Sequence, residues 1–79
     1  MKAKDMFERL GYKYYKTMES EDNINCKKEN YKIVFRLKSE NILLEKENNI
    51  FLLTKDMLQA INQQYKELGW LEQEQKDEN

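Results

Sequence analysis

Apolar residues near the start of the chain have the spacing of a helix. Ala3, Met6, Phe7 and Leu10 recur at intervals of three and four residues, and charged side chains lie between them. This spacing predicts a short amphipathic helix with one apolar stripe. Gly11 predicts the end of the helix, because a glycine adopts the left-handed backbone of a helix stop without a Cβ clash.

A second helix is predicted near the other end of the sequence. Thr54 is a favourable N-cap, and Asp56 lies in the first turn, where a carboxylate interacts well with the helix dipole. The predicted apolar stripe comprises Leu58, Ile61, Tyr65 and Leu68, with Met57 and Ala60 alongside. Gly69 predicts the end of this helix.

The segment between the two helices alternates apolar and polar residues in short runs, which predicts β-strands. In the clearest run, Tyr31, Ile33, Phe35 and Leu37 point one way, and Lys32, Val34, Arg36 and Lys38 point the other. The other predicted strands are 12–18, a weak strand around Ile24 and Cys26, 42–46 and 50–53. In the short connection 28–30, Asn30 is suited to a left-handed conformation.

These elements predict an α+β fold. Short hairpin connections favour an antiparallel β-meander of four to five strands, and two amphipathic helices can both cover its apolar face. The N-terminal and C-terminal helices are therefore expected on one face, with the other face open to solvent. Residues 1–71 are predicted to form a single domain, and 72–79, which contain no apolar residue, a disordered charged tail.

The residue types offer no recognisable catalytic set. The chain has no histidine, so Ser20, Ser39 and the lone Cys26 lack the usual activating base. The acidic residues at 19, 21 and 22 lack the spacing and the glycine of a calcium loop, and we interpret them as solvated turn charges. We expect no catalytic residues, no metal and no cofactor, and we predict that the protein is not an enzyme.

Charge and hydropathy narrow the expected location and partners. The net charge is −1, with basic side chains in excess in the first half of the chain and acidic side chains in the second. This balance argues against a dedicated nucleic-acid binder. No apolar run has the length of a membrane span, so we expect a cytoplasmic protein without a membrane partner.

One predicted surface is suggestive. The basic side of the central strands gives a candidate binding site made of Lys27, Lys32, Val34, Arg36 and Lys38. Such a face, joined by a tyrosine of the 12–15 run, can stack bases and hold phosphates, although lysines also keep an open sheet face soluble. Trp70 presents a second choice, because it either anchors a partner or seals the end of the second helix.

Both ends of the sequence show a family resemblance. The segments 4–12 (KDMFERLGY), 53–64 (LTKDMLQAINQQ) and 67–70 (ELGW) resemble a family of small phage and prophage proteins of low-GC Gram-positive bacteria. The resemblance covers most of the chain, while the middle strands match only in pattern. It implies an origin in a phage or prophage, and a location in the cytoplasm of the host cell, but carries over no functional residues.

Three functions remain open at this point. The first is a non-enzymatic accessory protein that binds a host or phage protein through the open sheet face. The second is a weak nucleic-acid binder that uses the same face, and the third is an inhibitor of a host defence protein that uses acidic residues of the second half. Self-association through an unpaired sheet edge, giving a homodimer, is a further expectation.

Overall fold

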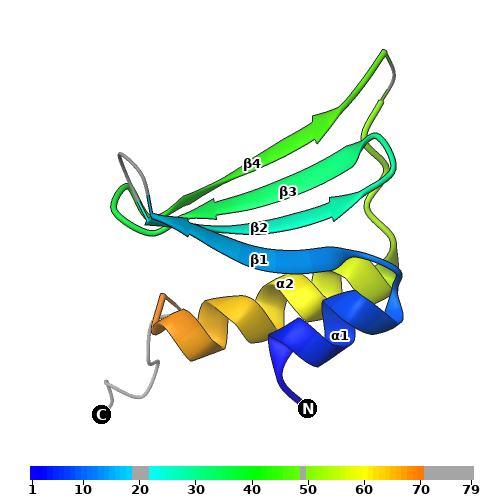
Figure 1. Ribbon diagram of the computed structural model, residues 1–79. Helices are drawn as coiled ribbons and strands as arrows, with labels where there is room; N and C mark the ends of the chain where they lie inside the picture. The colour runs from blue at the N-terminus through cyan, green and yellow to red at the C-terminus, as the bar shows by residue number, and fades with distance from the viewer. Residues whose placement is uncertain (19–21, 49, 71–79) are drawn as a thin grey trace, which may run out of the picture.

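The computed structural model describes residues 1–18, 22–48 and 50–70, and these form a four-stranded antiparallel sheet and two helices (Figure 1). In chain order the elements are α1 (Ala3–Arg9), β1 (Lys13–Met18), β2 (Asp22–Lys28), β3 (Tyr31–Arg36), β4 (Asn41–Lys46) and α2 (Lys55–Leu68). Both helices lie on the same side of the sheet (Figure 1), which confirms the predicted α+β arrangement.

Each strand pairs with the next one along the chain, so the spatial order β1-β2-β3-β4 is the predicted meander. In one cross-strand row, Tyr14, Cys26, Ile33 and Leu44 are opposite one another. This row faces the helices, and we call that side of the sheet the inner face. Because side chains alternate along a strand, every second residue points to the opposite side, which we call the outer face.

Both helix ends are built as the sequence predicts. Gly11 follows α1 with a φ of 94°, and Gly69 follows α2 with a φ of 75°. The hydroxyl oxygen of Thr54 accepts a backbone N–H of the first turn of α2 at 3.2 Å. After Gly69, the backbone N–H of Trp70 donates to the carbonyl of Tyr65 at 2.9 Å, as in a Schellman-type helix stop.

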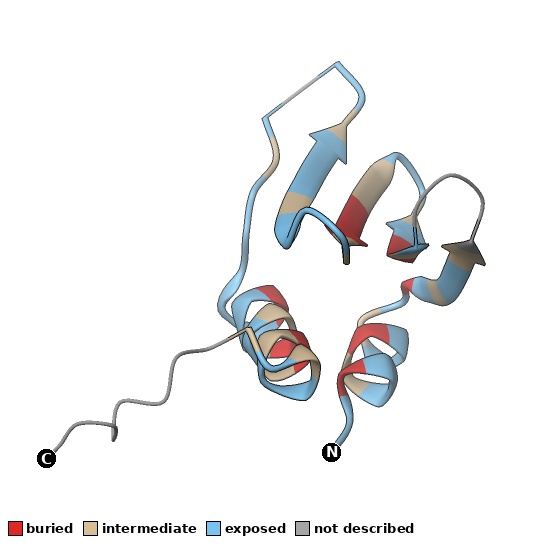
Figure 2. Ribbon diagram, turned by 90° about the vertical axis from the view of Figure 1, so that its left-hand side faces the viewer, coloured by how far each residue is buried: buried red, intermediate tan, exposed pale blue. Residues whose placement is uncertain are grey.

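The core lies between the inner face and the helices (Figure 2). Its largest fully buried side chains are Phe7, Phe35, Ile33 and Cys26. The ring of Phe7 packs edge to face against Tyr12 and Phe35, with ring centroids 5.8 and 6.1 Å away. The short helix α1 is thus held by its apolar stripe, since a helix of its length has little stability alone.

Hydrogen bonds fasten the helices to each other and to the sheet. The backbone N–H of Ala3 donates to the carboxylate of Glu67 at 2.7 Å, which joins α1 to α2. The hydroxyl of Tyr14 donates to the side-chain oxygen of Gln64 at 2.6 Å, which joins β1 to α2.

The buried stripe of α2 differs from the prediction. Met57, Ala60 and Gln64 are buried, whereas Leu58 is 50% exposed, so its assignment to the core was wrong. The predicted residues Ile61, Tyr65 and Leu68 are half-buried beside this stripe. The hydrogen bond from Tyr14 explains the shift, because it satisfies the Gln64 amide oxygen and so lowers the cost of burying a polar side chain.

The segment 50–53 is not a strand, so the sheet has the lower number of strands in the predicted range. Its aromatic residue decides its path. The ring of Phe51 packs edge to face on Tyr31, with centroids 5.1 Å apart, at the end of the sheet. The segment therefore connects β4 to α2 without joining the ladder.

Two loop assignments also need comment. Glu29, with a φ of 53°, adopts the left-handed conformation predicted for Asn30. Lys28 pairs with Tyr31, so the β2–β3 loop has two residues, and tight hairpins of this length place a positive φ at the first of them. The predicted tail at 72–79 and the acidic residues 19 and 21 lie outside the described residues.

Candidate binding surface on the outer face of the sheet

The outer face is organised in three cross-strand rows fixed by the strand register. The central row contains Tyr15, Asn25, Val34 and Leu43. A charged row on one side contains Lys13, Lys27, Lys32 and Glu45. A polar row on the other side contains Thr17, Asn23, Arg36 and Asn41.

The residues of the central row are buried to different extents, although neither helix of the described residues lies over them (Figure 1). Val34 and Asn25 are each only 5% exposed, whereas Tyr15 and Leu43, on the two edge strands, are 41% and 37% exposed. The side chains of neighbouring strands screen the middle of the row. The side-chain NH2 of Asn25 donates to the hydroxyl of Thr17 at 3.2 Å, so its burial is partly compensated.

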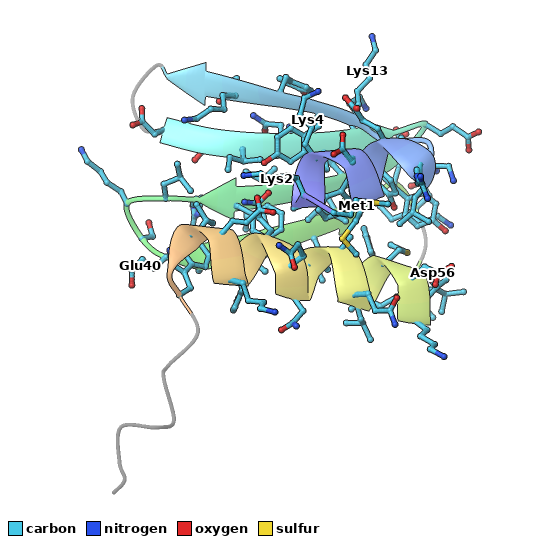
Figure 3. All side chains as sticks on the ribbon, turned by 90° about the horizontal axis from the view of Figure 1, so that it is seen from below. Met1, Lys2, Lys4, Lys13, Glu40 and Asp56 are labelled. Carbon is cyan, nitrogen blue, oxygen red and sulfur yellow. The ribbon has the colours of Figure 1, made fainter. Side chains whose placement is uncertain are left out.

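The cations of the outer face are held at the surface by local partners. Lys27 donates from its ammonium group to the carbonyl of Glu29 at 3.1 Å, and Arg36 donates from Nε to the side-chain oxygen of Asn41 at 2.9 Å. Lys13 extends from the β1 side of the molecule into open space (Figure 3). Positive charge on the outer face therefore comes from β1, β2 and β3.

Acidic side chains interrupt this positive charge at one end of the face. Lys32 lies directly across from Glu45 on β4. Lys27 and Lys32 line a shallow groove together with Glu29, Asn30, Glu45 and Glu47. The end of the face nearest β4 is consequently mixed in charge, which the sequence analysis did not anticipate.

Four of the five predicted binding residues share this surface. Lys27, Lys32, Val34 and Arg36 lie on the outer face, but Lys38 does not, because β3 ends at Arg36. Lys38 lies in the four-residue turn before β4, where Glu40 donates its backbone N–H to the carbonyl of Arg36 at 2.8 Å and has a φ of 59°. The strand thus ends two residues earlier than the sequence pattern suggested.

The sequence analysis missed other members of the face. Lys13, Tyr15, Asn25 and Leu43 belong to it by register. The alternation around Ile24 and Cys26 pointed to Asn25, but the aromatic run of β1 gave no clear alternation. A hollow at the β1 end is lined by Lys13, Tyr15 and Lys27, among other residues, and extends around the strand to Gly11.

The remaining candidate chemistry lies on the inner face and is closed off. Cys26 is fully buried, and burial raises the pKa of its thiol to about 12. Burial, together with nearby Cys26 and Glu67, raises the pKa of Tyr14 to about 12, although the hydrogen bond to Gln64 acts in the opposite direction. A thiol with such a pKa is a poor nucleophile near neutral pH. The described residues contain no group of three or more side chains arranged to ligate a metal ion.

Trp70 behaves as a seal of the helix end. Its ring packs against Tyr65 and Phe35, with centroids 5.2 and 6.4 Å away, and it is half-buried. Of the two interpretations offered by the sequence, the structure supports packing of the residue after the helix stop onto the core.

Comparisons with known proteins give no match, whether to family models, to curated proteins or to solved structures. The family resemblance therefore stays a prediction. Neither helix in the described part of the chain is long and apolar enough to cross a membrane.

Proposed function

We propose that this protein is a small, non-enzymatic accessory protein of phage or prophage origin that binds another protein through the outer face of its sheet. The partner surface that fits is an acidic segment with an apolar side chain at its centre. The family resemblance in the first subsection supports the origin, and the layout of the outer face supports the binding mode.

The observation that carries the proposal is the combination of a central row that is apolar except for Asn25 with cations on both sides. Tyr15 and Leu43 offer exposed aromatic and aliphatic surface, and tyrosine is a common contributor to binding energy at protein interfaces. Lys13 and Lys27 flank this row on one side and Arg36 flanks it on the other. Such flanking charges orient an acidic partner and suppress basic ones.

Nucleic acid fits this surface less well. A single-stranded nucleic acid needs a continuous positive track and aromatic rings on which successive bases stack. Here Glu45 breaks the charged row, and Tyr15 is the aromatic residue of the central row. The whole chain also carries a net charge of −1. We therefore treat nucleic acid as the alternative that the experiment must distinguish.

The test is affinity capture from host-cell lysate, followed by identification of the partner and measurement of its affinity with purified components. The variant Lys27→Glu with Arg36→Glu reverses two charges on the outer face. The matched control, Lys55→Glu with Lys66→Glu, reverses two charges on α2, on the other side of the molecule. We expect at least a tenfold loss of affinity with the first pair and less than a threefold change with the second.

Three outcomes would contradict the proposal. Wild-type affinity in both double variants would remove the outer face from the binding site. Capture that disappears after nuclease treatment, with a steep dependence on salt, would favour the nucleic-acid alternative. Loss of binding in both variants to the same extent would point to total charge rather than to one face.

A further inference from the structure

The two edges of the sheet differ in how they are protected. The β1 edge carries Lys13 and Lys16, and lysines on an edge strand discourage pairing with another chain. The β4 edge instead presents Ile42, Leu43 and Leu44 in succession, with Leu43 37% and Leu44 41% exposed. β4 is the last strand of the sheet, and in the described residues no strand pairs with the edge of β4 that points away from β3 (Figure 1).

The ladder defines which backbone groups this edge offers. Leu37 directly follows β3 and lies opposite Asp22, and its N–H donates to the carbonyl of Asp22 at 3.1 Å. The backbone groups of the odd-numbered residues of β3 therefore bond toward β2. In an antiparallel sheet the bonding direction alternates, so the even-numbered residues of β3 bond toward β4. Through the register, Leu43 then bonds inward to Val34, and the N–H and C=O groups of Ile42 and Leu44 point to the free edge.

From these features we infer that β4 pairs with β4 of a second copy of this chain, antiparallel and about a two-fold axis at Leu43. Opposite residues in such a pair face the same side of the sheet. On β4 the even-numbered residues face inward and the odd-numbered residues face outward, so an even-numbered residue must lie opposite an even-numbered one and an odd-numbered residue opposite an odd-numbered one. The two central registers with this property place the axis at Leu43 or at Leu44. They differ in the side chains that they bring together.

The axis at Leu43 gives the better match of side chains. On the inner face it places Ile42 of one copy opposite the partner's Leu44, so apolar side chains meet apolar side chains. On the outer face it places Leu43 against the partner's Leu43. It also brings Lys46 close to the partner's Glu40, where opposite charges attract. The axis at Leu44 would instead place Ile42 opposite the partner's Lys46.

This pairing has a structural consequence for the outer face. Two four-stranded sheets become one continuous sheet, and the β4 edges disappear from the surface. The central row of one copy then continues into that of the other through the two Leu43 side chains. The inference depends only on the β4 edge and does not depend on the partner proposed above.

The first experiment measures the mass of the protein in solution over a range of concentrations from micromolar to about one millimolar. We expect the wild-type mass to rise from one chain to two. Leu44→Lys should stay monomeric throughout. The matched control is Tyr15→Lys on β1, where the replaced side chain has the same 41% exposure, and it should dimerise like the wild type.

The second experiment tests the register by cross-linking. In a background with Cys26→Ala, Leu43→Cys places two thiols opposite each other in a non-hydrogen-bonded pair, where the Cβ atoms are close enough for a disulfide. Mild oxidation should give a covalent dimer with Leu43→Cys, and at least tenfold less with Leu44→Cys.

Each other result would overturn the inference. A wild-type mass of one chain at every concentration would exclude the dimer. Dimerisation of Leu44→Lys, or its loss in Tyr15→Lys with the fold intact by circular dichroism, would exclude the β4 edge. Stronger cross-linking at Leu44→Cys than at Leu43→Cys would exclude the Leu43 axis.

Discussion

The two faces of the sheet consist of alternating residues of the same strands, but they are buried in different ways. Phe35 on the inner face is covered by Phe7 and Trp70, which come from distant parts of the chain. Val34, the residue before Phe35 on β3, is almost as buried, yet neither of the two helices of the described part of the chain lies on its side of the sheet. Burial by a covering layer holds the fold together, whereas burial by neighbouring side chains in the sheet leaves a face open to solvent.

The largest expected difference between the faces lies in these two adjacent residues. Phe35→Ala should lower the free energy of unfolding by about 3–5 kcal/mol, because it leaves a cavity enclosed on all sides. Val34→Ala should cost only about 1–2 kcal/mol, because it removes two methyl groups beside side chains that can close over the gap. Urea denaturation of both variants measures the difference, and equal losses would contradict the contrast.

Alkaline pH should have the second largest effect, because it lowers the free energy of unfolding through a buried group of the inner face. Burial raises the pKa of the Cys26 thiol from 9.0 to about 12. The unfolded chain therefore releases this proton at a lower pH than the folded protein, so stability is complete below about pH 9 and is lost as the pH rises toward 12. By pH 11 the loss is on the order of 2 kcal/mol.

The check is a series of urea unfolding curves between pH 8 and pH 11. Cys26→Ala should show a shallower decline than the wild type, and Tyr12 and Tyr14, whose pKa values burial also raises, contribute to the remainder. An identical decline in both proteins would show that the Cys26 thiol does not contribute.

The covering layer itself depends on the cap of α2. Thr54→Ala removes the oxygen that accepts a backbone N–H of the first turn, and should cost about 1 kcal/mol. Thr54→Ser retains an acceptor and should restore most of this loss. A thermal unfolding midpoint for each variant measures the effect, and identical midpoints for Thr54→Ala and the wild type would contradict it.

The smallest expected effects on stability are those of substituting two neighbouring lysines, one on each face of the sheet. Lys28, on the inner side, donates to the carbonyl of Leu10 at 2.9 Å and lies 5.7 Å from the centre of the Tyr12 ring. Lys27, on the outer face, makes an exposed hydrogen bond. Lys28→Gln should cost about 1 kcal/mol and Lys27→Gln less than about 0.5 kcal/mol. A larger loss at Lys27 would show that the outer face also carries stability.

Much of the fold follows from local sequence signals. Thr54 and the two glycines set the helix ends, and the alternation in 31–37 set the central strand, because these features act within a few residues. The predictions were wrong where contacts between residues far apart in the sequence determine the structure. The burial of Gln64 depends on Tyr14, and the path of the segment 50–53 depends on Phe51 packing against Tyr31.

The outer face could be predicted only in its central part. Lys32, Val34 and Arg36 follow from the alternation of one strand. The position of Glu45 opposite Lys32 requires the register between β3 and β4, which depends on where the intervening turn begins. Lys38 was misplaced for the same reason, since the strand pattern continues for two residues after the ladder has ended.

The hydrogen bond between Ala3 and Glu67 joins residues 64 positions apart, so it can form only after α2 has been synthesised. The four strands are paired with near neighbours and can form as they leave the ribosome, but α2 is made after them. Until the segment up to Trp70 has left the ribosome, α1 is the only helix of the described residues that can cover the apolar inner face of the nascent sheet. We therefore expect chaperone contacts with chains that are held on the ribosome through a C-terminal linker to decline once the linker is long enough to bring Trp70 outside the exit tunnel.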